Sequence, residues 1–264
     1  MKNNNLNQYP NTRMRRLRKT RAIRELVEET SLNVNDLIYP VFITDKNNSE
    51  NIELMPDIKR LCMNDLMQTA EKLVSHGIHA IALFPVIDKK YKSINGEEAY
   101  KSDGLIQKTI AKLKSEFPEL LVITDVALDP YTTHGQDGII DDNNYVTNDK
   151  TIQILKKQAL SHAEAGADIV APSDMMDGRI GAIRAELEKN NFHNTLILSY
   201  AAKYASCFYG PFRDAVNSSD SLATGNKNNY QMDPRNSDES LREVALDISE
   251  GADIVMIKPA MMYQ

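Results

Sequence analysis

The stretch that decides the fold is "VALDISEGADIVMIKPA" (residues 244–260), in which a helical pattern ends at a glycine and a short apolar run follows. The same pattern occurs in "QALSHAEAGADIVAPSD" (158–174) and "EKLVSHGIHAIALFPV" (71–86), and the pentapeptide GADIV appears at both 166–170 and 251–255. Each glycine stands where a helix ends and a left-handed residue is needed. Each run is apolar almost throughout, as in strands of a parallel sheet that are buried on both faces. The repeated unit predicts an α/β fold.

Six strands can be placed along the chain, with helical patterns between them. They are expected at residues 36–43, 80–86, 119–128, 168–173, 195–204 and 253–258. No strand is followed by a G-x-G-x-x-G or Walker-type phosphate loop, which disfavours a nucleotide-binding doubly wound fold. A TIM (β/α)8-type barrel is favoured instead, and a closed barrel of this type has eight strands.

The strand count gives a further expectation about chain organisation. We expect this chain to supply only six of the eight strands and to lack the last two βα units. Residues 1–30 are then a basic N-terminal arm, and residues 31–264 form a partial barrel. A barrel lacking two strands would be weakly active or inactive alone.

Composition restricts the class of function. The net charge of -6 disfavours a general nucleic-acid-binding role, and the one basic cluster, Arg13 to Arg24, is local. No apolar stretch approaches the roughly 20 residues that span a bilayer. The N-terminus lacks the apolar segment of a signal peptide. The two cysteines, Cys62 and Cys207, offer neither a disulfide framework nor zinc-ligand spacing, so a reducing cytoplasm is expected.

Polar residues occur where the predicted strands end, and in barrels of this type chemistry gathers at those ends. Two lysines, Lys203 and Lys258, end consecutive strands. The other strand ends carry Phe84, Asp125, Asp129, Ser173 and Asp174. A lysine in an apolar pocket near a second cation loses its proton near neutral pH and attacks carbonyl groups. Two such lysines can hold two carbonyl substrates side by side. We expect Asp125 to take part in catalysis and Ser173 to contact the substrate.

Several motifs together resemble the porphobilinogen synthase (5-aminolevulinate dehydratase) family. They read "DLIYPVF", "TDVALDPYTTHGQDG", "APSDMMDGR", "SYAAKYASCFYGPFRDA", "YQMDPRN" and "GADIVMIKPAMMY", in this order along nearly the whole chain. Members condense two molecules of 5-aminolevulinate into porphobilinogen, with loss of two waters, on the way to haem and other tetrapyrroles. The resemblance implies that this chain is such a lyase.

The resemblance also assigns roles to residues. Lys258 matches the lysine that forms the Schiff base with the first substrate, and Lys203 matches the lysine that engages the second. Arg213 resembles the arginine that grips a substrate carboxylate, which suits a guanidinium fork. Lys227 is either a second carboxylate-binding cation or a solvated loop lysine, since the neighbouring Asn228 stands where some members carry the basic residue. The matches also place Gln231 and Tyr204 near the substrates, although Tyr204 is equally compatible with packing.

The resemblance bears on metals too. Many members bind a catalytic zinc through three cysteines, whose positions here hold Ala127, Asp129 and Asp137. Zinc at such a site needs soft thiolates, so no zinc is expected. His134 in the same motif is expected to be a hydrogen-bonding loop residue. In the zinc-independent branch, Glu243 matches the single carboxylate of an activating, allosteric magnesium site between subunits. No organic cofactor is expected, and the basic arm is expected to wrap a neighbouring subunit in a homo-octamer.

Three other interpretations remain open at this level. One is an aldolase-like lyase that uses a single lysine, and another is a non-catalytic barrel remnant. The third treats residues 13–24 as an RNA-contacting arm, which would make nucleic-acid binding sensitive to salt.

Overall fold

The computed structural model describes residues 8–216 and 226–263, and its contacts divide the chain into two units, residues 1–36 and 37–264. The first unit contains a 3-10 helix (Met14–Arg18), α1 (Arg21–Leu26) and a second 3-10 helix (Val34–Asp36). The hydroxyl of Thr20 caps α1 by accepting a hydrogen bond from the backbone N–H of Ile23 at 3.2 Å. The described part of this unit contains no buried side chain, so it has no apolar core of its own.

The second unit is built on one eight-stranded sheet. Its strands are β1 (Ile38–Thr44), β2 (Glu50–Ile52), β3 (Met55–Leu61), β4 (Ala80–Val86), β5 (Leu121–Val126), β6 (Ile169–Pro172), β7 (Leu196–Lys203) and β8 (Ile254–Lys258). The strand order is β2-β3-β1-β4-β5-β6-β7-β8, and every neighbouring pair except β2 and β3 is parallel. The six predicted strands are confirmed to within about two residues at each end.

The expected total of six strands is wrong, because β2 and β3 also belong to the sheet. These two strands pair with each other in antiparallel fashion, and β3 extends the sheet beside β1. Their sequences, "ENI" and "MPDIKRL", contain no apolar run, and most of their side chains are exposed or half-buried. A search for buried apolar runs therefore passes over them.

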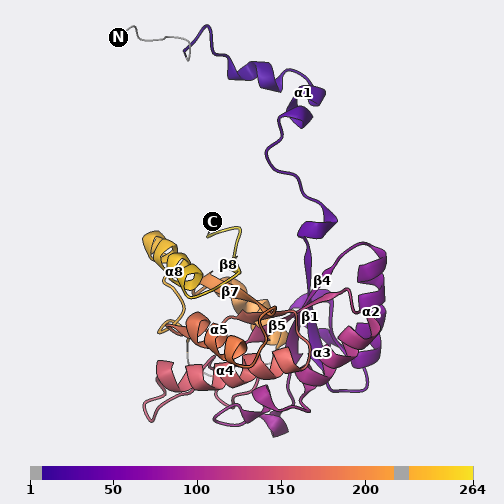
Figure 1. Ribbon diagram of the computed structural model, residues 1–264, viewed down its shortest axis with the longest axis vertical. Coiled ribbons are helices and arrows are strands. Elements are labelled where there is room, and N and C mark those ends of the chain that lie inside the picture. Colours follow the sequence, from indigo (N-terminus) through magenta and orange to yellow (C-terminus); the bar gives the residue numbers. More distant parts are fainter. Residues whose placement is uncertain (1–7, 217–225, 264) are drawn as a thin grey trace. The chain divides into compact units, whose positions relative to one another are not determined.

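Helices follow the strands and lie along the outside of the curved sheet (Figure 1). They are α2 (Met63–Ser75), α3 (Leu105–Glu116), α4 (Asn148–Glu164), α5 (Arg179–Lys189), α6 (Gly210–Ala215) and α8 (Ser237–Ser249). The glycines of the three repeated units, Gly77, Gly166 and Gly251, have φ angles of 75°, 103° and 106°. Positive φ is costly for other residues, which explains the glycine at each helix end.

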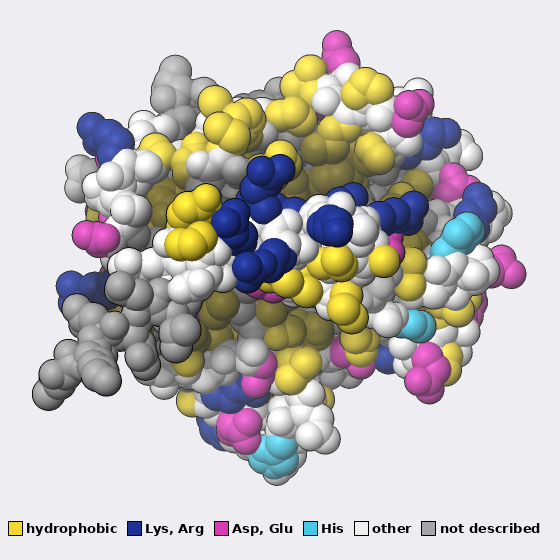
Figure 2. Space-filling model, turned by 90° about the horizontal axis from the view of Figure 1, so that it is seen from above, with side chains coloured by type: hydrophobic (Ala, Val, Ile, Leu, Met, Phe, Trp, Pro, Cys, Tyr) yellow, Lys and Arg dark blue, Asp and Glu magenta, His cyan; other side chains and the backbone are white. Residues whose placement is uncertain are grey.

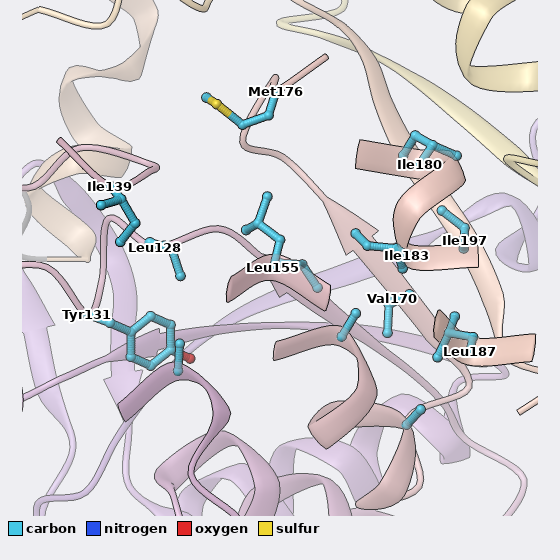
Figure 3. Close-up of a cluster of buried hydrophobic side chains, with 14 of the residues drawn as sticks. Leu128, Tyr131, Ile139, Leu155, Val170, Met176, Ile180, Ile183, Leu187 and Ile197 are labelled. Atoms are coloured by element: carbon cyan, nitrogen blue, oxygen red, sulfur yellow. The ribbon is translucent and has the colours of Figure 1, made fainter. Parts of the chain in front are cut away.

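Strands in the middle of the sheet are apolar because both of their faces are buried, whereas most residues of β8, at one end of the strand order, are exposed. On β6, Val170 belongs to a core cluster between the sheet and helices α4 and α5 (Figure 3), which also includes Leu155 and Ile183. The flanking residue Ile169 belongs to a different cluster, with residues of β5 and β7 such as Leu198. Alternate side chains thus fill the two sides of the sheet.

The aspartate of the first GADIV repeat fastens β6 to the beginning of the neighbouring strand. The Asp168 carboxylate accepts a hydrogen bond from the Val122 backbone N–H at 2.8 Å and pairs with Lys114 Nζ at 3.0 Å. Lys114 lies on α3 and Val122 on β5, so one carboxylate joins a helix, the strand after it and the next strand of the sheet.

The second GADIV repeat makes the equivalent contacts at the next position around the sheet. The Asp253 carboxylate accepts from the Ile197 backbone N–H at 2.8 Å and pairs with Arg184 Nη2 at 2.5 Å. Arg184 lies on α5 and Ile197 on β7. The recurring pentapeptide therefore marks a recurring way of docking a strand, in addition to its apolar content.

Contacts across the sheet show that it is strongly curved. Lys258 Nζ on β8 lies 5.8 Å from the centre of the Phe84 ring on β4, although three strands separate β4 from β8. In a flat sheet these strands would be about 19 Å apart. The sheet must therefore curl, as it does in a (β/α) barrel, and this brings the carboxyl ends of distant strands together.

Apolar side chains remain exposed near the last described elements. They include Leu241 and Ile248 on α8 and Ile254 and Ile257 on β8. Figure 2 shows hydrophobic side chains in several patches among charged ones on the face seen from above. Within residues 8–216 and 226–263, no helix has the length and hydropathy needed to cross a membrane.

Candidate active site

A pocket at the carboxyl ends of the strands collects most of the predicted site residues. Its lining combines two lysines on adjacent strands with buried carboxylates and aromatic rings. The lining residues are Phe84, Asp125, Asp129, Ser173, Tyr200, Lys203, Tyr209, Phe212, Arg213, Lys227, Gln231 and Lys258. A roomier cavity of about 520 Å³ lies near the ends of β1 and β4, but neither Lys203 nor Lys258 lines it. The chemistry points to the first pocket.

Lys203 and Lys258 are direct neighbours across the sheet. They end β7 and β8 and are partners in the parallel register of these strands. Lys203 Nζ donates a hydrogen bond to the Ser173 backbone carbonyl and lies 3.5 Å from Asp137 Oδ2. Its amine therefore has both a polar partner and a negative charge beside it.

Lys258 is placed in a very different environment. Its Nζ lies 5.0 Å from the ring centre of Phe212, 5.2 Å from that of Tyr200 and 5.8 Å from that of Phe84. Within the described residues, no hydrogen bond or ion pair involves this amine. Burial, together with the positive charge of Lys203, lowers the pKa of Lys258 to about 8. A usable fraction of this amine is therefore neutral and nucleophilic near neutral pH.

Asp125 is a buried carboxyl group that can exchange a proton near neutral pH. Burial and the negative charge of Asp129 raise the pKa of Asp125 to about 7, while Lys203 and the Ser173 side chain act in the opposite direction. Its Oδ1 atom is buried and has no hydrogen-bond partner within the described residues. A carboxyl group with this pKa, next to two amines, can serve as a general acid or base.

Lys227 is buried rather than solvated, with 6% of its surface exposed. Its Nζ lies 3.2 Å from Asp129 Oδ2 and also donates to Asp137 Oδ1. The expected alternative of a solvated loop lysine is thus wrong for this conformation. The ammonium lies between the Asp129 and Asp137 carboxylates, and these negative charges outweigh burial and raise the pKa of Lys227. In this structure the two aspartates neutralise a lysine.

The other predicted contacts differ in how close they come to the pocket. Arg213 and Gln231 line it, and within the described residues the Arg213 guanidinium makes no ion pair. Tyr204 is buried and stacks on Tyr263, with ring centres 4.9 Å apart, and it is not a lining residue. The packing alternative therefore describes Tyr204. His134 contacts the Ile94 carbonyl and accepts from a loop N–H, as expected of a hydrogen-bonding loop residue.

Glu243 lies on α8, outside this pocket. It lines a separate cavity of about 350 Å³ with three other carboxylates, Asp177, Asp233 and Glu239. Burial and the charge of Asp247, followed by that of Asp177, raise the pKa of Glu243. Gln231 lines both this cavity and the catalytic pocket. Within residues 8–216 and 226–263 there is no cluster of three or more side chains positioned to hold a metal ion.

A buried arginine supports the pocket from behind. Arg179 Nη2 donates to the Tyr200 backbone carbonyl at 3.3 Å and to the Ser199 hydroxyl at 3.2 Å, and it pairs with Asp247 Oδ2 at 3.2 Å. The Tyr200 ring touches Lys258, and Asp247 lies on α8. Arg179 thus joins α5, β7 and α8, and it contacts the backbone of the residue whose ring touches Lys258.

Sequence reasoning missed Tyr200, Tyr209 and Phe212 as site residues. Tyr200 lies inside an apolar strand, where an aromatic residue is indistinguishable from core. Phe212 precedes Arg213 in "GPFRDA", and this adjacency is the one signal that could have found it. Tyr209 donates a hydrogen bond to the Lys258 carbonyl at 3.1 Å, a contact that only the three-dimensional structure reveals.

Comparison with known proteins agrees with the two-lysine pocket. A family model described as delta-aminolevulinic acid dehydratase matches residues 11–264. The chain belongs to this family. The dehydratase of Methanothermus sociabilis is 55% identical over 256 residues, which cover 97% of this chain and 78% of that protein. The dehydratase of Bradyrhizobium diazoefficiens is 50% identical, over 95% of this chain and 71% of the relative.

A solved structure of a family member is also similar in fold. The delta-aminolevulinic acid dehydratase (porphobilinogen synthase) of Toxoplasma gondii, crystallised with its reaction product porphobilinogen, superposes with a TM-score of 0.93 at 48% identity. The match covers 96% of this chain and 72% of that one. The dehydratase family thus accounts for both the sequence motifs and the arrangement of strands and helices.

Proposed function

We propose that this protein is a porphobilinogen synthase, a lyase that condenses two molecules of 5-aminolevulinate with loss of two waters. The observation that carries the proposal is the pair of register partners Lys203 and Lys258 at the mouth of a curved parallel sheet. Family membership supplies the substrate class. The product serves the formation of haem and other tetrapyrroles.

Lys258 is the residue we expect to form the first covalent bond. Its neutral amine adds to the keto carbon of one 5-aminolevulinate, and the carbinolamine then loses water to give a protonated imine. The lowered pKa supports this role, because only the unprotonated amine carries the lone pair that attacks.

Lys203 is expected to engage the second substrate, so that two carbonyl compounds lie side by side and the entropic cost of joining them falls. Asp125 is close enough to influence both amines and is suited to moving protons between the amines and the substrates. Arg213 is available to bind a substrate carboxylate through a bidentate contact. Lys227 would have to leave Asp129 and Asp137 to bind a second carboxylate directly.

A divalent cation, magnesium by preference, is proposed to act at the cavity of Glu243. The support is the raised pKa of Glu243, which a bound cation would reverse, in a cavity that other carboxylates also line. Glu243 would be the principal protein ligand, because no three side chains among the described residues are positioned to hold an ion together. Bound there, the ion would supply an activating positive charge away from the reacting atoms. Retained waters would complete its shell, since few protein ligands are typical of magnesium. Zinc fits Asp129 and Asp137 poorly, because both are hard oxygen ligands already paired with Lys227.

Assembly and location are further parts of the proposal. A homo-octamer in which the basic arm wraps a neighbouring subunit agrees with the absence of a core in residues 8–36. Both cysteines are free thiols, which suits the reducing environment of a cytoplasm.

Incubating the purified protein with 5-aminolevulinate and assaying the pyrrole product tests the proposal. We expect Lys258→Ala and Lys203→Ala each to lower the rate by at least about a thousandfold, as loss of covalent catalysis does. The exposed Lys189, at the end of α5, provides a control, and Lys189→Ala should leave the rate unchanged. An aldolase-like enzyme with one essential lysine would instead keep most activity in Lys203→Ala.

A further inference from the structure

Three aromatic rings surround the Lys258 amine and take the place of hydrogen-bond acceptors. Phe84 comes from β4, Tyr200 from β7 and Phe212 from α6, and all three ring centres lie within 5.8 Å of Nζ. Lys203, one strand away, also lies 5.8 Å from the centre of the Tyr200 ring, but its amine has a backbone carbonyl and a carboxylate as polar partners. The two lysines of the pocket therefore share one ring, and only Lys258 has rings in place of polar partners among the described residues.

The rings are held firmly in place. Phe84 and Phe212 meet edge to face, with ring centres 5.3 Å apart and planes at 88°. Phe42 on β1 packs against both of them, at 5.9 Å and 5.8 Å, and completes a buried aromatic cluster. Phe42 itself has no contact with the Lys258 amine within the described residues. The rings of Phe84 and Phe212 are thus positioned by packing against aromatic neighbours.

We propose that Phe84, Tyr200 and Phe212 form an aromatic cage that stabilises the protonated imine formed on Lys258. This inference rests on the proposed function. In the step concerned, the nitrogen lone pair of the neutral amine bonds to the keto carbon. The carbinolamine hydroxyl then leaves as water, and one proton is taken up, so the product carries a single positive charge on the C=N group.

The cage favours the imine over the free ammonium for a physical reason. An ammonium group has three N–H donors and loses three hydrogen bonds with water when it is surrounded by rings. A protonated imine has one N–H and a charge spread over two atoms, so it loses less. The faces of the rings attract either cation through their quadrupoles. The difference in desolvation therefore shifts the equilibrium towards the covalent intermediate, in agreement with the lowered pKa of the free amine.

Levulinate, the same keto acid without the amino group, is a suitable probe because it can form the imine but not the pyrrole. The fraction of Lys258 trapped by cyanoborohydride is measured by mass spectrometry at several pH values. Phe212→Leu keeps the site apolar and removes the ring, so we expect about tenfold less imine at equilibrium. Phe212→Tyr keeps a ring and should stay within about twofold of the unmodified protein. Phe192→Leu removes a ring from the core cluster of Leu155 and Ile183, outside the pocket lining, so it is the matched control and should trap as the unmodified protein does.

The pH dependence separates a cage from simple exclusion of water. Lys203, Asp125 and Asp129 are the charged groups that act on Lys258, and none of them is changed in these variants. With a cage, the midpoint of trapping in Phe212→Leu stays near or below that of the unmodified protein. Normal trapping, or weaker trapping with the midpoint moved towards the ordinary lysine value of 10.5, would overturn the proposal.

Phe84→Leu on a different strand gives the same test if Phe212→Leu does not fold. Failure of the cage and failure of the proposed function remain distinguishable. If the unmodified protein traps no levulinate at Lys258, the Schiff-base chemistry itself is refuted, and the cage with it.

Discussion

At the scale of single residues, the pocket brings the pKa values of an acid and a base close together. Lys258 is lowered to about 8 and Asp125 is raised to about 7, each chiefly by burial. In water these groups would differ by more than six units. Because the difference between the two pKa values is small, a proton can pass between carboxyl and amine at little cost in free energy. Schiff-base formation and the loss of water both require such proton transfers.

This arrangement predicts a specific pH dependence. The Asp125 carboxyl is protonated below about 7 and the Lys258 amine is neutral above about 8, so kcat/KM should rise with pH in two steps near these values. Asp125→Asn should remove the lower step, keep the upper one, and lower the rate by about a hundredfold or more. A pH–rate profile of both proteins measures this. A variant that retains the lower step would show that another group titrates there.

At the scale of elements, the aspartates of the two GADIV repeats hold their strands in the sheet through hydrogen bonds and ion pairs, in addition to the apolar packing of the strands. The Asp168 carboxylate serves a backbone N–H of β5 and the Lys114 ammonium at once, and Asp253 does the same one unit later. Neither aspartate lies in the pocket. They fix where β6 and β8 begin relative to the neighbouring strands β5 and β7. The positions of the residues at the carboxyl ends of β6 and β8 follow from this.

Removing the Asp168 carboxylate, which acts as a clamp between β5, β6 and α3, should therefore lower the stability of the fold more than it lowers the catalytic rate. Asp168→Ala leaves the Val122 N–H and Lys114 without their partner, so we expect a loss of about 2 kcal/mol in the free energy of unfolding. Asp168→Asn keeps an acceptor oxygen and should lose about 1 kcal/mol or less. Urea denaturation of the three proteins measures the difference. Equal stability of the Ala variant and the unmodified protein would contradict the clamp.

The elements also show how far sequence reasoning reaches. Apolar runs such as 80–86 predicted six of the eight strands, because a continuous apolar run is a direct signature in the sequence, although β8 proves to be mostly exposed in the structure. Strand β3, polar and mostly exposed, leaves none. In the site, Lys203 and Lys258 could be predicted because a lysine is conspicuous after an apolar strand. Tyr200 could not, since an aromatic side chain in a strand has the same appearance in a core as in a pocket.

At the scale of the whole molecule, stability depends on buried ionisable groups with opposite effects. Burial lowers the pKa of His162 to about 3, and its Nδ1 contacts the Thr124 hydroxyl at 3.0 Å. Burial also raises the pKa of Asp174 to about 6. Below the unfolded pKa of 6.5, the unfolded chain binds a proton that native His162 does not, so His162 lowers stability as the pH falls. Asp125 and Asp174 have raised pKa values in the folded protein, so they take up protons on folding and increase its stability as the pH falls.

A variant isolates the histidine contribution. Between pH 7 and pH 5 the native protein should lose about 2 kcal/mol more unfolding free energy than His162→Gln, because the variant has no group at that position that titrates. Denaturant midpoints at both pH values, converted with a common slope, give the comparison. If the two proteins lose stability in parallel, His162 is not held neutral in the native state.

The most direct test of the account is to find which lysine carries the substrate. The protein is incubated with 5-aminolevulinate, reduced with borohydride, digested and analysed by mass spectrometry. We expect the reduced adduct on Lys258, retained in Lys203→Ala and absent from Lys258→Ala, because burial among the three rings lowers the pKa of the Lys258 amine. An adduct on Lys203 alone, or on neither lysine in a preparation that makes the pyrrole, would contradict the account.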